Sequence, residues 1–589
     1  MSRSVRDQLL IVVVGCIVLL TRLGATGLWD LDEALWGGTA VEMARRGDWI
    51  TPWHNGEVST HKPPFMFWAM LVGTRVCGQT EFGFRIGSAL FGLATALVVQ
   101  RLGTALACRR VGLLAGVATV TALNFAVVAR GATPDVMLTF FTTLALLIFV
   151  RHVAPAGWPP AGRIGPLPLP AAIAFYTVLG LAVLTKGPLG VALPLAAIGL
   201  FLWWHNLAAA PVAAGGRVLR VVREWCGAVA VLRPLVGVVV VLAIAGPWYV
   251  LVQRSSGGAF GADFIGFHHI KRFLEPIEGH SGPLVYYVPA LLIGMFPWSM
   301  FAIPSALHAA ARLWGRGPAR AGTMLLVAWL ITWIGVFSVA QTKLPNYILP
   351  AYPAATLLVA GFLVEWLTEP SPSSRRWMQV ALGLLVGIGG MAFAGCLTAP
   401  HLRLGGRGLL EAATAAPELA GLLRLAAWTG VIIAVGGTIC LALVGADRRR
   451  AALVAYVGMA AAVVLFLLGV VAVEADRHQP AREIVRIMRD HGASDSTPLG
   501  QCRYTQPSLV YYAGRRVEPC REAEGCIDFF RRFPHGMLVI RARDEAEARG
   551  LVPPGGEVIG QCPSFPKAGR ILVVHQPQAT AALPVPQAR

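Results

Sequence analysis

Apolar runs of 17 residues or more recur from end to end of this chain of 589 residues. Each run is long enough for one helix to cross the hydrocarbon core of a bilayer, which is about 30 Å thick. The composition agrees, because 14% of the residues are charged, whereas soluble proteins carry about 25%. The sequence therefore predicts a polytopic α-helical membrane protein.

Thirteen of these runs qualify as membrane spans. They cover residues 9–25, 84–101, 111–128, 134–150, 170–185, 188–204, 234–252, 285–307, 321–340, 347–367, 377–397, 425–445 and 451–473. The first run follows a short polar segment with Arg3 and Arg6, as a signal peptide would. No small-x-small cleavage site leads from it into a soluble domain, so we interpret it as an uncleaved span.

Arginine residues predict the orientation of the chain, because they gather in every second loop. They are Arg101, Arg109, Arg110, Arg151, Arg163, Arg217, Arg220, Arg223, Arg233, Arg312, Arg316, Arg320, Arg375, Arg376, Arg448, Arg449 and Arg450. Cytoplasmic loops carry an excess of Lys and Arg, so these six loops and the N-terminus are predicted to be cytoplasmic. The net charge of +19 follows from this pattern. Because no basic stripe is interleaved with aromatic residues, nucleic acid is not an expected partner.

Three substantial pieces then face the outer side, namely the loops 25–83 and 253–284 and the segment 474–589. In the last of these, Ala481–His491 has the helical spacing of apolar residues. Strand-like runs follow it, separated by Gly and Pro turns. They are Leu509–Tyr512, Met537–Arg541 and Arg570–His575. We predict a small extracytoplasmic α/β domain.

Four cysteines lie in that predicted domain: Cys502, Cys520, Cys526 and Cys562. An even number of cysteines in a small domain outside the cytoplasm favours two disulfides, although four cysteines allow three pairings. The alternative is a structural zinc site, but the spacing contains no CxxC pair.

The first outer loop begins with three carboxylates within four residues, Asp30, Asp32 and Glu33. Such neighbours repel one another and can hold one pKa high, which suits a general base. The competing interpretation is an interfacial anchor of Trp29 and solvated acids.

Cations follow in both large outer loops. His61 and Lys62 precede two prolines and an aromatic run, and His268, His269, Lys271 and Arg272 lie in the second loop. Lys is a compact charge suited to a phosphate, and cations on the outer side indicate an anionic partner. An anchor to lipid headgroups and a solvated loop are the plainer explanations.

Asp135, Lys186 and Lys343 lie at the outer ends of predicted spans. Each alone can reach the interface without a function. Together with the loop residues they form a layer of carboxylates and cations, which is what gripping a lipid phosphate and activating a nearby hydroxyl requires.

Nine motifs carry a family resemblance. They are LWDLDEA, MARRGDWITP, HKPPFMFW, TPDVML, LTKGPLG, HHIKRF, PLVYYVP, GMFPWS and TKLPNYILP. In this order they resemble the bacterial transferases that move aminoarabinose from undecaprenyl phosphate to lipid A, and the wider family related to protein O-mannosyltransferases. The resemblance covers about residues 20–365.

The resemblance implies a GT-C glycosyltransferase fold with inverting transfer. Residues 1–473 would form the transmembrane catalytic domain, with the active site in the two outer loops, and residues 474–589 the extracytoplasmic domain. Asp32 matches the catalytic Asp, with Glu33 beside it and Asp135 as a second carboxylate. The residues implied or expected to hold the lipid phosphate are Lys62, Arg272, Tyr347 and Lys343.

One position departs from the aminoarabinose transferases, which have a Glu where this chain has His61. That Glu is associated with metal binding near the sugar, and His269 matches a family histidine that can ligate a metal. His61 and His269 therefore form a candidate pair for a zinc ion. The departure leaves the identity of the sugar open.

The expected protein is thus a glycosyltransferase spanning the bacterial inner membrane many times, with its active site outside. It would move a sugar from a polyprenyl (undecaprenyl) phosphate donor to an acceptor such as lipid A or lipopolysaccharide. Protein Ser or Thr is the alternative acceptor. A secondary transporter is the alternative of another class, but it would place polar residues near the bilayer midplane.

Overall fold

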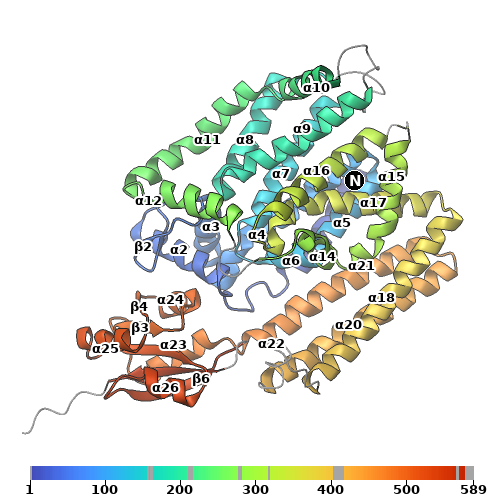
Figure 1. Ribbon diagram of the computed structural model, residues 1–589. Coiled ribbons are helices and arrows are strands. Elements are labelled where there is room, and N and C mark those ends of the chain that lie inside the picture. The colour runs from blue at the N-terminus through green and yellow to red at the C-terminus, as the bar shows by residue number, and fades with distance from the viewer. Residues whose placement is uncertain are drawn as a thin grey trace, which may run out of the picture.

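The structure is a computed structural model that describes residues 3–154, 158, 164–209, 217–275, 281–315, 317, 319–401, 417–565 and 569–576. Long helices form a bundle, and a sheet domain lies at one end of it (Figure 1). The marked N-terminus lies toward the other end of the bundle (Figure 1). Arg163 and Arg316 of the predicted cytoplasmic loops fall outside the described residues.

Ten of the described helical segments are long and apolar enough to cross a membrane. They are α4 (Glu81–Leu106), α7 (Asp135–Val153), α8 (Leu169–Lys186), α9 (Leu189–Ala209), α11 (Pro234–Ser255), α16 (Ala319–Val339), η4 with α17 (Pro345–Ala351, Tyr352–Thr368), α18 (Pro372–Thr398), α20 (Pro417–Gly445), and α21 with η6 and α22 (Arg449–Phe466, Leu467–Val471, Ala472–Asp476). The protein is therefore a multi-pass membrane protein.

Two bent helix pairs raise the number of candidate spans to 12 among the described residues. The first joins α5 (Arg109–Thr121) to α6 (Leu123–Arg130) at 63°. The second joins a segment of η2 and α14 to one of η3 and α15 at 113°. These elements are η2 (Leu284–Tyr286), α14 (Tyr287–Gly294), η3 (Trp298–Phe301) and α15 (Ala302–Trp314).

The predicted number of thirteen spans is not confirmed. The predicted first span coincides with α1 (Arg3–Leu20), which is not among the 12 and begins with Arg3, Arg6 and Asp7. Asp7 is buried and accepts hydrogen bonds of 2.5 and 2.6 Å from the Arg109 guanidinium. This ion pair ties the start of α1 to the start of α5.

Shorter elements make up the two large loops that the sequence places outside. The first loop folds into α2 (Asp32–Arg46), the hairpin of β1 (Trp53–His54) and β2 (Glu57–Val58), and α3 (Phe65–Cys77). The second contains α12 (Ala259–Gly261), η1 (Ala262–Lys271) and α13 (Arg272–Leu274). Within the described residues, the other connecting helices are α10 (Arg217–Val231) and η5 (Ala399–His401).

The C-terminal segment forms a five-stranded sheet in the order β4-β3-β5-β7-β6. Its strands are β3 (Leu499–Cys502), β4 (Val517–Cys520), β5 (Met537–Ala542), β6 (Glu557–Pro563) and β7 (Arg570–His575). Strands β4, β3 and β5 run parallel to one another, and β7 is antiparallel to both of its neighbours, β5 and β6. Apolar side chains are buried on both faces of the sheet, where helices pack against it. These helices are α23 (Pro480–Asp490), α24 (Pro507–Ala513), α25 (Ala523–Arg532) and α26 (Glu545–Leu551). The predicted small C-terminal α/β fold is confirmed.

One predicted strand is wrong, because Leu509–Tyr512 lies in helix α24. The valine and tyrosines of this run favour strands, but Pro507 begins a helix and Gly514 ends it with a left-handed φ of 67°. Packing of α24 against α2 then decides the conformation. Figure 1 shows α24 on the side of the sheet domain that faces α2 and β2.

The prediction of two disulfides is also wrong for this structure, in which all four cysteines of the domain are free. Cys502, Cys520 and Cys526 share one hydrophobic cluster, and Cys562 belongs to the cluster on the other face of the sheet. A second disulfide would have to join Cys562 to a cysteine on the opposite face, and it would therefore have to cross the sheet. The two faces are separate because side chains of successive strand residues point to opposite sides.

Candidate active site

A cavity of about 420 Å³ lies between the bundle and the two outer loops. Its polar lining residues are His61, Lys62, Lys186, Arg272, Thr342 and Tyr347. Its apolar lining comes from Leu138, Leu189, Leu193, Phe264, Ile270, Phe273, Leu274, Trp333, Val336, Phe337 and Ala340. The cavity therefore combines several cationic side chains with a largely apolar lining.

Asp32 is the first residue of α2. Its surface remains exposed, yet protein surrounds it closely enough that desolvation raises its pKa above the usual value of 3.8. Lys62 opposes this increase most strongly, and Lys186 and Arg272 also lower the pKa, whereas Asp135 raises it. Asp32 thus lies within electrostatic range of every charged residue of the cavity.

Lys62 projects from the short segment before α3, which Pro63 and Pro64 stiffen. Its ammonium lies 5.6 Å from the centre of the Trp36 ring. Desolvation, together with repulsion by Lys186, lowers the pKa of Lys62 to about 8. At neutral pH this ammonium is therefore largely protonated, but it is poorly hydrated and ready to pair with an anion.

His61 packs edge-on against Trp36, with ring centroids 5.7 Å apart, and its Nδ1 is 3.2 Å from the Ser59 hydroxyl. Burial lowers the pKa of His61 to about 4, so its imidazole is neutral at physiological pH. A neutral imidazole can ligate a metal.

His269 is the predicted partner of His61 in binding a metal. Its side chain lies outside the described residues, so the distance between the two imidazoles is not described. Among the side chains that the structure describes, no group of three His, Cys, Asp or Glu can hold a metal ion.

Asp135 and Lys186 form an ion pair across the cavity edge. Asp135 is the first residue of α7 and Lys186 the last of α8, and their side chains are 10% and 12% exposed. The Lys186 ammonium also lies 5.1 Å from the centre of the Tyr347 ring. The sequence placed Lys186 at a span end but not among the phosphate ligands; its position between Thr185 and Gly187 at the end of an apolar run was the available signal.

Arg272 is joined to the segment that precedes Tyr347. The carbonyl of Arg272 accepts a hydrogen bond of 3.4 Å from the backbone N–H of Thr342, and that of Phe273 accepts one of 3.0 Å from Gln341. The second outer loop is thereby held over the same cavity as Tyr347.

Lys343 has a different environment from the one predicted for it. Its ammonium donates hydrogen bonds of 2.7 Å to the carbonyls of Ser338 and Ala340, at the C-terminal end of α16. Cations stabilise these unpaired carbonyls of a helix end. Lys343 does not line the cavity, so the structure does not bring it together with Lys62 and Arg272.

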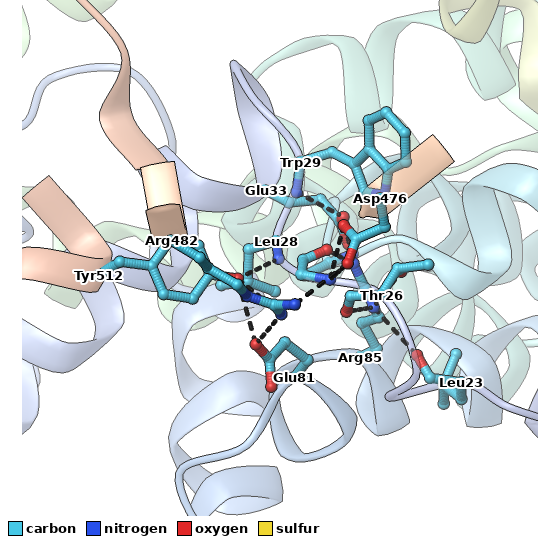
Figure 2. Close-up of polar contacts among 12 residues, drawn as sticks. Leu23, Thr26, Leu28, Trp29, Glu33, Glu81, Arg85, Asp476, Arg482 and Tyr512 are labelled. Carbon is cyan, nitrogen blue, oxygen red and sulfur yellow. Dashed lines mark hydrogen bonds and ion pairs between the residues drawn. The ribbon is translucent and has the colours of Figure 1, made fainter. Parts of the chain in front are cut away.

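Glu33 also points away from the cavity and forms a buried ion pair with Arg85 (Figure 2). It accepts from the Arg85 guanidinium at 2.8 and 2.7 Å and from the backbone N–H of Ala132 and Trp29 at 2.7 and 3.2 Å. Because both of its oxygens are engaged, the geometry favours a structural role for Glu33 over the predicted catalytic one.

Comparison with known proteins gives matches to sugar transferases. Residues 61–219 match the family described as dolichyl-phosphate-mannose-protein mannosyltransferase. The undecaprenyl phosphate-alpha-4-amino-4-deoxy-L-arabinose arabinosyl transferase of Pectobacterium carotovorum is 28% identical over 414 residues, or 68% of this chain and 67% of that protein. Its counterpart in Edwardsiella ictaluri is 29% identical, over 63% of this chain and 62% of the relative. The chain therefore matches about two thirds of the length of these relatives.

The fold is similar along the whole chain to a solved structure, that of ArnT from Cupriavidus metallidurans bound to undecaprenyl phosphate. The TM-score is 0.74 at 22% identity, covering 98% of this chain and 99% of that one. This likeness confirms the predicted GT-C fold class. Together the matches confirm the resemblance to polyprenyl-phosphate sugar transferases.

Proposed function

We propose that this protein is an inverting glycosyltransferase that moves a sugar from undecaprenyl phosphate to an acceptor hydroxyl. The observation that supports this most directly is the convergence of Lys62, Lys186 and Arg272 with Asp32 at one largely apolar cavity. The proposed location is the bacterial inner membrane, with the cavity and the sheet domain on its outer side.

The charges of the cavity suit a phosphate leaving group. Three cations and two carboxylates, Asp32 and Asp135, leave one net positive charge near the site. The Asp135–Lys186 ion pair holds one of those cations in place. Fixed positive charge stabilises the negative charge that develops on the departing phosphate oxygen, and a partly dry site strengthens the effect.

The reaction follows from this arrangement. The acceptor hydroxyl oxygen attacks the anomeric carbon of the sugar, and the bond between that carbon and the phosphate oxygen breaks. The hydroxyl proton passes to the Asp32 carboxylate, whose raised pKa suits a general base. The lipid phosphate leaves with the bonding electron pair toward Lys62, Lys186 and Arg272.

The apolar part of the cavity supports a lipid donor. Leu189 and Leu193 of α9 and Trp333 and Phe337 of α16 line the same cavity as the cations. Such a wall is complementary to a polyprenyl chain, which gains about 25 cal/mol for each Å² of apolar surface removed from water.

The acceptor class is proposed from the relatives. Matches to aminoarabinose transferases favour a lipid A or lipopolysaccharide acceptor, and the mannosyltransferase match keeps protein Ser or Thr as the second candidate. Zinc remains a proposal attached to His61 and His269, and no step above depends on it. The polar groups lie at the ends of α7 and α8, whereas a transporter would have them at mid-membrane.

The decisive experiment compares Asp32→Asn and Lys62→Ala in purified protein with an undecaprenyl-phosphate sugar donor. Asp32→Asn should abolish single-turnover transfer but leave donor binding intact, since a lost general base costs ~10²–10⁴-fold in rate. Lys62→Ala should weaken binding as well, because the phosphate charge is present in the ground state and the transition state.

Matched controls are Asp263→Asn and Lys271→Ala, which change exposed charges of the second outer loop outside the cavity lining. Both should transfer sugar at the wild-type rate. Transfer by Asp32→Asn at that same rate would contradict the proposed base, and Asp135 would be the next candidate.

A further inference from the structure

The loop between α1 and α2 leads directly into Asp32, the first residue of α2, and has no regular secondary structure of its own over residues 25–29. Its backbone groups are instead satisfied by side chains that are remote in sequence, from the bundle on one side and from the sheet domain on the other (Figure 2). A general base at the end of such a loop is only as well placed as these contacts allow.

On the bundle side, Arg85 of α4 holds the loop. Besides Glu33, its guanidinium donates to the carbonyls of Leu23, Thr26 and Gly27 at 3.0, 2.8 and 2.5 Å. The Arg85 side chain is 3% exposed, so these carbonyls have a buried and rigid partner.

On the opposite side, residues near and within the sheet domain hold the next backbone groups. The N–H of Gly27 donates to both carboxylate oxygens of Asp476 at 2.9 Å, and the N–H of Leu28 donates to the Tyr512 hydroxyl at 2.9 Å. Arg482 of α23 binds both partners, at 3.1 Å from Asp476 and 3.2 Å from the Tyr512 hydroxyl. Figure 2 shows Arg482 between Tyr512, Glu81 and Asp476.

This cluster is also anchored to the bundle, because Arg482 donates to Glu81 of α4 at 2.7 Å and the Tyr512 hydroxyl to the same carboxylate at 3.1 Å. The fit leaves no room for a side chain at Gly27. A Cβ there would lie 2.5 Å from the Tyr512 hydroxyl and 2.8 Å from an Arg482 nitrogen.

A second contact lies two residues before Asp32. The Asp30 carboxylate accepts hydrogen bonds from the backbone N–H of Ser508, at 2.8 Å, and from the Ser508 hydroxyl. Ser508 is 1% exposed and lies in α24, the helix of the sheet domain that packs on α2. The sheet domain thus contacts the loop directly at Leu28 and Asp30, and its Arg482 binds the Asp476 carboxylate that holds Gly27.

We propose that the C-terminal sheet domain positions the general base: Ser508 holds Asp30, Tyr512 holds Leu28, and Arg482 fixes the Asp476 carboxylate that holds Gly27. This inference rests on the proposed function, because it assigns Asp32 the role of base. Proton transfer and nucleophilic attack require the base in a near-attack geometry, and a displacement of 1 Å can cost about 10²-fold in rate. Ser508, Arg482 and Tyr512 are therefore positioning residues.

The test is a double-mutant cycle of Asp30→Asn and Ser508→Ala, measured as kcat and donor KM, with amide hydrogen exchange over residues 28–34. Each single variant should lower kcat about tenfold at unchanged donor KM and speed exchange over that segment. The double variant should be no worse than either single one, because both changes remove the same contact. The matched control is Ser496→Ala, an exposed serine of the same domain, which should leave kcat and exchange unchanged.

The outcomes separate this inference from the proposed function. An active wild-type protein whose Ser508→Ala variant keeps its kcat, or loses kcat and thermal stability together without faster exchange at residues 28–34, overturns the positioning role alone. Additive losses in the double variant also overturn it. A wild-type protein that transfers no sugar from the polyprenyl phosphate donor overturns the proposed function, and this inference with it.

Discussion

The Lys186 ammonium donates a hydrogen bond to the Asp135 carboxylate, joining the last residue of α8 to the first residue of α7. The ion pair links two helices at the cavity, and the same ammonium lies 5.1 Å from the centre of the Tyr347 ring. A charge placed on helix ends in this way is held more rigidly than one on a loop.

Lys186→Met should therefore reduce transfer by ~10²–10³-fold, the usual cost of removing one group that stabilises developing negative charge. Lys186→Arg, which keeps the charge, is the matched control and should retain most activity. Single-turnover rates on both variants provide the measurement. Equal rates for Lys186→Met and wild type would show that Lys186 serves only to pair with Asp135.

The pH dependence of donor binding should report Lys62. Desolvation depresses the pKa of Lys62 to about 8, below the usual 10.5. Below pH 8 the ammonium is charged and binds the donor phosphate, and as the pH rises through about 8 it loses its proton. Donor KM should therefore increase on the alkaline side, with kcat affected less. Lys62→Arg should remove this alkaline limb, since guanidinium stays protonated; a limb that persists in this variant would assign it to another group.

Glu33→Gln should affect stability more than chemistry. Removing one partner of a buried ion pair costs about 3–5 kcal/mol, because it leaves the Arg85 guanidinium without its counter-charge. We expect a lower unfolding temperature in detergent, but a rate per folded molecule far above that of Asp32→Asn. If Glu33→Gln is fully stable and inactive, Glu33 is catalytic after all.

The predicted orientation can be tested with native cysteines, because Cys77 and Cys108 are both exposed. Cys77 belongs to the first outer loop and Cys108 to the first Arg-rich loop. In intact cells, a membrane-impermeant maleimide should label Cys77 and a cysteine introduced by Glu545→Cys in the sheet domain, but not Cys108. The reverse pattern would invert the topology.

The oxidation state of the cysteines tests the structure of the sheet domain. Because Cys562 is buried on the face opposite the other three cysteines, mass spectrometry of unfolded, unreduced protein should find Cys562 as a free thiol. Burial raises its pKa to about 12, so in the folded protein it should also react slowly with alkylating reagents. A disulfide between Cys562 and one of the other three cysteines would show that Cys562 does not lie on the opposite face of the sheet.

Much of the architecture was accessible from local sequence patterns. Each predicted span coincides with helical segments, because the length of an apolar run and the bilayer thickness are set by the same physics. The C-terminal strands Met537–Arg541 and Arg570–His575 were also correct within a residue. Leu509–Tyr512 failed, because its strand propensity is weaker than the packing of α24 on α2.

The candidate site was also predictable only in part from the sequence. Asp32, Lys62, Arg272 and Tyr347 were identified by motif, and the structure brings them to one cavity or its rim. The family resemblance singled out Asp32 as the catalytic Asp, but the chemistry of two adjacent carboxylates gave no reason to exclude Glu33 as a second catalytic group. Successive residues at a helix start point in different directions, so one faces the cavity cations and the other faces Arg85, 52 residues away.

By itself, the sequence determined where the apolar segments of this protein lie, which charged residues stand at their ends, and which chemistry its motifs resemble, because each of these depends on residues close together in the chain. Only the tertiary structure decided that Lys186 faces Tyr347, that Lys343 caps α16, and that Asp476 and Tyr512 hold Gly27 and Leu28, contacts that span up to 484 residues. Which charges meet depends on how the helices pack, and that packing is a property of the whole chain.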